Sequence, residues 1–202
     1  MDAHKLQLKI YLTPESARTL DAEALIPVFH RWIKQRVLPE LTIDVANYRH
    51  VPNGPGVVLI GHGADYFLDE GEGRPGLLHN RKRAGLAPGD RLSDLARRTL
   101  HAAALLEKDL ALTGKAKFAT NELLFRVNDR LAAPNSDATL AALRPELEAL
   151  AKQLFGGPFE LAREGGPKQL FAVRIKSSAS PPLAALVERA GGPPTADASL
   201  VA

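Results

Sequence analysis

The sequence predicts an α+β protein in which an antiparallel sheet carries helices packed on one face. Segments with the two-residue alternation of strands are followed by longer segments with the periodicity of amphipathic helices. Several strand segments are separated only by turns, which is typical of antiparallel hairpins. The 202 residues, 45% of them hydrophobic, are enough to build one domain with a substantial core.

The first part of the chain predicts a strand, a helix and a hairpin. "KLQLKIYL" (5–12) alternates polar and apolar residues as a half-buried strand does. A helix is expected over 21–37, and its apolar stripe consists of Leu25, Phe29, Trp32 and Ile33. "LTIDVANYRH" and "GVVLIGHG" then form two strands joined by a turn.

The last part of the chain predicts the same order of elements. A strand over 121–129 precedes a helix over 136–155, whose stripe is Leu140, Leu143, Leu147, Leu150 and Leu154. "FELARE" and "QLFAVRI" follow as a second hairpin.

Three features of the two parts share an offset of 118 residues, which predicts internal duplication of a β-α-β-β unit. The helix prolines Pro27 and Pro145 differ by 118, the strand segment 124–129 aligns with 6–11 at the same offset, and Phe159 aligns with Leu41. The pseudo-repeats extend over about 5–62 and 121–177. An ordinary α+β domain with two similar helices is the alternative.

A hairpin (64–82) and a helix (90–110) are expected between the pseudo-repeats. Asp90 is the predicted N-cap, and the stripe of this helix is Leu92, Leu95, Ala96, Thr99, Ala103 and Leu106. Residues 1–180 are thus predicted to form a single globular domain. The remainder, 181–202, is predicted to be a short amphipathic segment, "PPLAALVERAGG", followed by a disordered tail.

Composition excludes several classes of function. The absence of cysteine rules out disulfides, thiolate nucleophiles and cysteine-bound metals. A formal charge of +3 with interspersed charges, one tryptophan and three tyrosines argue against nucleic-acid binding. No window approaches the ~20 apolar residues of a membrane span, and the N-terminus lacks a signal-peptide pattern, so a cytoplasmic protein without membrane contact is expected.

The stretch "NYRHVPNGPGVVLIGHGADY" places two histidines near a glycine-rich and proline-rich turn. If Asn53 and Gly54 centre that turn, His50 faces Val57 and His62 faces Val45, so the two histidines are too far apart to share a metal ion. His62 points to the more apolar face, either as a core histidine or as a polar group in a ligand pocket.

The hairpin 64–82 holds a stronger constellation. A turn centred on Glu72 and Gly73 would place Tyr66 opposite His79, a pair that can bind a ligand or transfer protons. The alternative is an aromatic pair packed on a sheet. Arg81, Lys82 and Arg83 continue the second strand as a basic patch that could meet an anion, or simply as a solvated strand end.

The sequence contains no phosphate-binding glycine loop, zinc-binding helix motif or nucleophile elbow. No catalytic residue, metal ligand or cofactor is therefore assigned. The candidate ligand-binding residues are His62, Tyr66, His79, Asn47 and Trp32.

The duplicated order of strand, helix, strand and strand resembles, in topology, the paired modules of the GyrI-like and SOUL-type families, although none of their motifs is present. That resemblance implies a small-molecule ligand in a groove between the two pseudo-repeats. The alternatives are a protein–protein interaction or accessory subunit that uses the C-terminal segment, and an enzyme that uses Tyr66 and His79 in acid–base chemistry. A homodimer is also expected.

Overall fold

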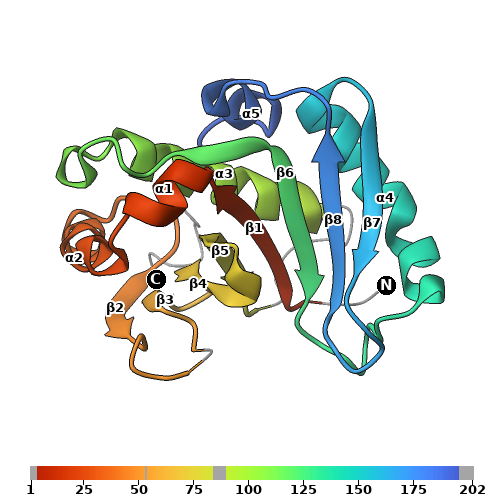
Figure 1. Ribbon diagram of the computed structural model, residues 1–202, viewed down its shortest axis with the longest axis horizontal. Helices are drawn as coiled ribbons and strands as arrows, with labels where there is room; N and C mark the ends of the chain where they lie inside the picture. The colour runs from red at the N-terminus through yellow and green to blue at the C-terminus, as the bar shows by residue number, and fades with distance from the viewer. Residues whose placement is uncertain (1–3, 53, 84–89, 196–202) are drawn as a thin grey trace.

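The computed structural model describes residues 4–52, 54–83 and 90–195. In this part of the chain, eight strands form one antiparallel sheet, and the helices pack on one of its faces (Figure 1). The predicted α+β class is therefore confirmed.

The strands are β1 (Leu6–Leu12), β2 (Thr42–Asn47), β3 (Val57–Gly61), β4 (Ala64–Asp69), β5 (Gly76–Arg81), β6 (Phe118–Val127), β7 (Phe159–Glu164) and β8 (Phe171–Ser177). The α-helices are α1 (Pro14–Thr19), α2 (Leu25–Gln35), α3 (Arg91–Lys108), α4 (Asp137–Phe155) and α5 (Leu183–Arg189). Short 3₁₀ turns include η1 (Ala22–Ala24) and η2 (Gly71–Gly73).

The strand order in the sheet is β2-β3-β4-β5-β1-β6-β8-β7. The two middle strands are therefore β5 and β1, and β6 follows next to β1, with Lys9 opposite Leu124. The predicted duplication is not confirmed, because β8 pairs with β6 whereas β5, rather than β3, pairs with β1. We call β4-β5-β1 and β7-β8-β6 the two triplets. In each of them the three strands pair in this order, and the triplets meet where β1 pairs with β6.

The core lies between the sheet and the helices. Leu8 and Ile10 of β1 and Phe125 of β6 are fully buried there, with Leu95 of α3 and Leu147 of α4 in the same apolar cluster. All six residues of the stripe predicted for α3 are buried. Burial of this apolar area is the main contribution to the stability of the fold.

The C-terminal segment packs on its own domain. The apolar residues of α5, which are Leu183, Leu186 and Val187, belong to the same core, and the helix contacts α3, α4 and β6. Residues 196–202 of the tail predicted to be disordered lie outside the described residues.

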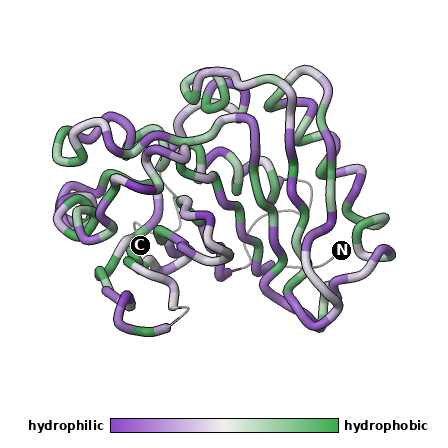
Figure 2. The backbone as a smooth tube through the Cα atoms, in the orientation of Figure 1, coloured by the Kyte–Doolittle hydropathy of each residue, from purple (hydrophilic) through white to green (hydrophobic). Residues whose placement is uncertain are grey.

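Strand β1 is fully buried, so the prediction of a half-buried strand is wrong. Polar and apolar residues alternate along it (Figure 2), but its polar side chains are covered too. Lys9 is 0% exposed, and its ammonium group donates to Asp69 at 2.6 Å. Gln7 donates to Asn80 of the neighbouring strand at 3.0 Å.

The helix predicted over 21–37 is divided in two. Asp21 caps η1 by accepting from the Glu23 amide, and α2 then starts at Leu25, so that Pro27 lies in its first turn. The helix ends at Gln35 and is followed by the C-cap Arg36, whose φ is 50°. In contrast, α4 has the bounds expected, with Ser136 as its N-cap and Pro145 inside it.

The register predicted for the first hairpin is wrong. Val45 lies opposite Leu59 rather than His62, and Val57 lies opposite Asn47 rather than His50. The connection is longer than a two-residue turn, because β2 ends at Asn47 and the Tyr48 amide donates to the Gly56 carbonyl at 2.8 Å. The predicted turn residue Asn53 is outside the described residues.

Candidate functional site

The hairpin of β4 and β5 has the register that the sequence predicts. Tyr66 lies opposite His79 and Asp65 opposite Asn80. The rings of Tyr66 and His79 stack with centroids 4.6 Å apart and planes 4° apart. The two side chains are therefore in contact, on the face of the sheet that the helices cover.

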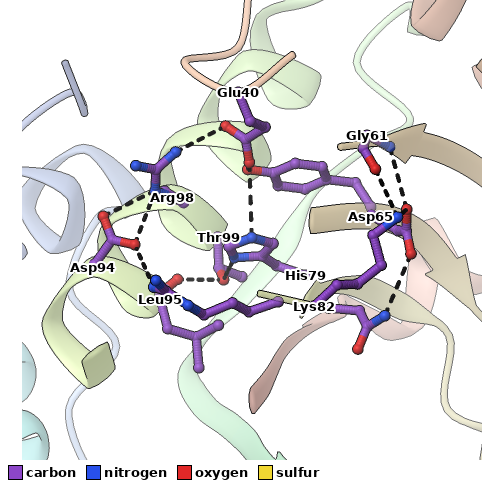
Figure 3. Close-up of polar contacts among 12 residues, drawn as sticks. Glu40, Gly61, Asp65, His79, Lys82, Asp94, Leu95, Arg98 and Thr99 are labelled. Carbon is purple, nitrogen blue, oxygen red and sulfur yellow. Dashed lines mark hydrogen bonds and ion pairs between the residues drawn. The ribbon is translucent and has the colours of Figure 1, made fainter. Parts of the chain in front are cut away.

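Further polar side chains surround the pair. We call Glu40, Tyr66, His79, Asp94, Arg98 and Thr99 the Glu40 cluster. Glu40, from the segment between α2 and β2, accepts the Tyr66 hydroxyl proton in a very short hydrogen bond and accepts from Arg98 at 3.1 Å. Figure 3 shows Glu40 between Arg98 and His79, with Arg98 extending from α3 toward both Glu40 and Asp94. The cluster thus ties α3 to the β4–β5 hairpin.

Burial sets the protonation states in the Glu40 cluster. Burial, and after it the nearby Arg98 charge, lower the pKa of His79 to about 3. Burial also raises the pKa of Glu40, against the Tyr66 hydrogen bond and the Arg98 charge, which lower it. The pKa of Tyr66 is raised well above its usual value by burial and by Glu40. His79 is therefore a neutral imidazole at pH 7.

The hydrogen bonds of Thr99 define the tautomer of His79. The Thr99 hydroxyl donates its one proton to the Leu95 carbonyl at 2.6 Å, so its oxygen accepts from His79 Nδ1 at 3.3 Å. The proton therefore lies on Nδ1, and Nε2 faces a Glu40 oxygen 3.8 Å away. Among the described residues, Nε2 has no hydrogen-bond partner.

The Glu40 cluster is enclosed. Tyr66 is 0% and His79 1% exposed, so a substrate would reach either group only if α3 moved off the sheet. The titratable side chains of the cluster form hydrogen bonds and ion pairs with one another. Their geometry supports a structural role, with α3 fixed on the hairpin.

Among the described residues, no hydrogen bond or ring contact joins the other candidate ligand-binding residues to this pair. Trp32 is buried in the core beside Phe29, with ring centroids 5.5 Å apart. Asn47 is exposed on β2 and accepts from the Arg49 amide. His62 is half-buried in the turn between β3 and β4, where its amide donates to the Leu41 carbonyl. The structure thus brings together two of the five candidates.

Two members of the predicted basic patch are paired with carboxylates. Arg81 donates to Asp94 at 3.0 Å, and Lys82 donates to Asp65 at 2.7 Å. Arg83 is exposed at the end of the hairpin. The patch is therefore largely neutralised by its own neighbours.

A cavity of about 670 Å³ lies on the opposite face of the sheet, which the helices leave open. We call it the arginine pocket. Its lining residues are Tyr11, Gly71, Arg74, Leu124, Arg126, Glu164, Gly165, Gln169, Leu170, Ala172 and Arg174. It extends over β1, β6 and β8, across the junction of the two triplets, and its volume is typical of a small-molecule site.

The charged side chains of the arginine pocket are held in place by ion pairs. Arg74 donates to both oxygens of Glu122, at 2.7 and 2.9 Å, and its guanidinium lies 3.8 Å from the centre of the Tyr11 ring. The hydrogen bond from Arg74 lowers the pKa of Glu122. Arg174 pairs with Glu164 at 2.7 Å.

The sequence analysis missed the arginine pocket. One signal was present, because Leu124 and Arg126 of β6, and Ala172 and Arg174 of β8, each place an arginine two residues after an apolar residue. Two such positions in a strand lie on one face. Glu122 and Lys176 lie on the same face, however, so the pattern is also that of an ordinary solvated strand face.

The described residues contain no group of three histidine, aspartate or glutamate side chains arranged to hold a metal ion. None of the described helices combines the length and the apolar character that a membrane span requires.

No protein family, curated protein or solved structure was found to match this chain. The topological resemblance to the GyrI-like and SOUL-type families therefore stays a prediction.

Proposed function

We propose that the protein binds a small molecule in the arginine pocket. The observation that carries the proposal is a cavity of about 670 Å³ which combines an apolar floor with several fixed arginines. Pockets that bind small molecules use a few placed polar groups to orient the ligand, and the fixed arginines can serve in this way.

The floor of the pocket supports this proposal. Tyr11, Leu124 and Ala172 form an apolar cluster of their own on the open face, separate from the main core. Leu124 is 1% exposed, and ion-paired side chains stand around it. The floor is thus packed and rigid, and the charged walls above it supply groups that can fix the orientation of a ligand.

The alternative function, a protein–protein interaction through the C-terminal segment, has less support. The apolar residues of α5, on which docking to a partner depended, are buried in the core of the same chain. Acid–base catalysis by Tyr66 and His79 would require access to an enclosed pair. Small-molecule binding needs neither rearrangement.

The test is to fill the pocket without changing its charge. A fragment library is screened against the full chain by ligand-observed NMR, and native mass spectrometry identifies any molecule retained during purification. Ala172→Leu should abolish binding, because Ala172 lines the pocket. Ala162→Leu is the matched control, since Ala162 of β7 lies opposite Arg174 of β8 and is not among the lining residues.

Fragments that bind the wild type and the Ala162→Leu protein but not the Ala172→Leu protein would support the proposal. Binding that is equal in all three proteins, or no binding at all to the wild type, would refute it. Thermal melting of each variant verifies that it is folded.

A further inference from the structure

Strand β2 is one edge of the sheet, and in the described part of the chain no other strand pairs with its outer side (Figure 1). The backbone groups along such an edge can pair with a strand of another molecule. The Tyr48 amide donates to the Gly56 carbonyl, so the backbone groups of Tyr48 face β3. Because this direction alternates along an antiparallel strand, the amides of Val45 and Asn47 face outward, away from β3.

Apolar side chains gather around this edge. Six large apolar side chains are exposed among the described residues, and four of them lie between positions 41 and 51, namely Leu41, Ile43, Tyr48 and Val51. A sheet edge with exposed apolar neighbours is prone to pair with a strand of another chain. The β2 edge is therefore a place at which two copies of this chain could associate.

Asp44 occupies a hydrogen-bond donor in the middle of the edge. Its exposed side chain accepts from the Val45 amide at 2.8 Å, and this amide is one of those that face outward. An incoming strand would have to displace the carboxylate before one of its carbonyl groups could accept from Val45. It would thereby replace a hydrogen bond to a charged group by a weaker, neutral one.

The charge of Asp44 also opposes the pairing of two copies. Two β2 strands that are related by a two-fold axis and joined edge to edge run antiparallel. If Val45 lies on that axis, Asp44 is opposite the partner's Ala46, and the two Asp44 side chains are diagonal neighbours on one face, roughly 7–8 Å apart. Like charges at this distance repel each other, most strongly at low salt.

A β-bulge limits the edge on its other side. Thr42 pairs with Gly61 and Asp44 pairs with Ile60, so Ile43 is an additional residue in β2. Bulges bend an edge strand and interrupt its pairing, and they are a common protection of sheet edges. The regular part of the β2 edge thus begins at Asp44, directly beside the occupied Val45 amide.

From the outward direction of the Val45 amide, its hydrogen bond to Asp44 and the apolar surroundings, we infer that Asp44 prevents the β2 edge from pairing with a second copy of this chain. This inference goes beyond the proposed function. The arginine pocket is lined by residues of β1, β6 and β8 and by none of β2, so the test needs no ligand.

The experiment measures the molar mass of the full chain by size-exclusion chromatography with light scattering over a range of protein concentrations. Asp44→Ala should form a species of about twice the wild-type mass, and its share should increase with concentration. The wild type should keep its mass over the same range. Glu160→Ala is the matched control, because it removes an exposed carboxylate from β7, the other edge strand, and it should keep the wild-type mass.

A proline at Asn47 tests whether the association uses this edge. Asn47 is exposed and its amide faces outward, so Asn47→Pro removes an edge donor without removing a hydrogen bond to β3. The double variant Asp44→Ala/Asn47→Pro should return to the wild-type mass. In Asp44→Ala alone, the Val45 and Asn47 amides should exchange their hydrogens more slowly at high protein concentration than at low concentration. Thermal melting verifies that each variant is folded.

Three results would overturn the inference. Asp44→Ala could keep the wild-type mass at every concentration, Glu160→Ala could associate to the same extent, or Asn47→Pro could leave the association of Asp44→Ala unchanged. None of these results bears on the proposed function, which depends on fragment binding that is sensitive to Ala172→Leu.

Discussion

Replacing His79 by glutamine should make the stability of the protein less sensitive to acid. Burial lowers the pKa of His79 to about 3, whereas the same side chain in the unfolded chain has a pKa of 6.5. Between these values the unfolded chain binds one proton more at this position than the folded protein does. The contribution of His79 to the free energy of unfolding is therefore complete above pH 6.5 and is lost as the pH falls toward 3.

The magnitude follows from that difference. One proton taken up on unfolding changes the free energy of unfolding by about 1.4 kcal/mol for each pH unit. Between pH 6.5 and 5.0 the wild type should thus lose about 2 kcal/mol through His79 alone. The raised pKa of Glu40 acts in the opposite direction, since a folded-state carboxyl with a raised pKa gains stability as the pH falls. Both proteins contain Glu40, so the comparison between them isolates His79 to a first approximation.

The assay is urea unfolding at pH 7.5 and 5.0, followed by the fluorescence of Trp32, which is the only tryptophan and is buried. The wild type should lose about 2 kcal/mol more than His79→Gln over this interval. His30→Gln, at an exposed position of α2, is the control and should retain the loss of the wild type. Equal losses in the wild type and His79→Gln would mean that His79 takes up no additional proton on unfolding, and the argument from burial would be refuted.

Three further predictions concern stability in urea unfolding at pH 7. Tyr66→Phe removes a hydrogen bond to a buried carboxylate and should cost about 1.5–3 kcal/mol, whereas Tyr48→Phe, at an exposed tyrosine, should stay within about 0.5 kcal/mol of the wild type; equal effects would contradict the buried bond. Lys9→Met should cost roughly 3 kcal/mol, because it leaves Asp69 without its closest cation, and a double-mutant cycle with Asp69→Asn should show losses well below additive; additive losses would show that the pair is uncoupled. Ser136→Ala should cost about 1 kcal/mol through loss of the cap of α4, and an unchanged midpoint would show that the cap contributes nothing.

The loop that connects the two strands decided which hairpin register could be predicted from the sequence. The connection between β4 and β5 (residues 70–75) is symmetric about positions 72 and 73, so counting outward from these two residues gave the correct partner for Tyr66. The connection from β2 to β3 contains Pro52 and Pro55 and forms a longer loop. A loop of uncertain length leaves the register undetermined, and a one-residue shift moves every side chain to the other face.

The helices were predictable because their apolar stripes are local. The stripe of α3 was identified residue by residue, and α4 has the bounds that Ser136 as an N-cap indicates. The Glu40 cluster was predicted only in part. Tyr66 and His79 are related by one hairpin, whereas Glu40 and Arg98 reach them through tertiary packing of segments far apart in the sequence.

The arginine pocket depends still more on long-range pairing. Tyr11, Arg74 and Arg174 come from three distant parts of the chain, and strand pairing alone brings them to one face. The polar alternation of β1 was interpreted as a solvent-exposed face. The other face of the sheet is instead a second, charged layer in which Lys9 is fully buried.

The position of β1 at the centre of the sheet has a consequence for synthesis of the chain. Gln7 pairs with Asn80 and Leu6 pairs with Val127, so β1 completes its pairing only after β6, which is synthesised much later, has been made. At roughly 5–20 residues per second, translation leaves that apolar segment waiting on the order of ten seconds. A nascent chain of this kind exposes Leu8 and Ile10 to chaperones that bind short hydrophobic segments, and its folding should be slow for its size because so many of its contacts are distant in sequence.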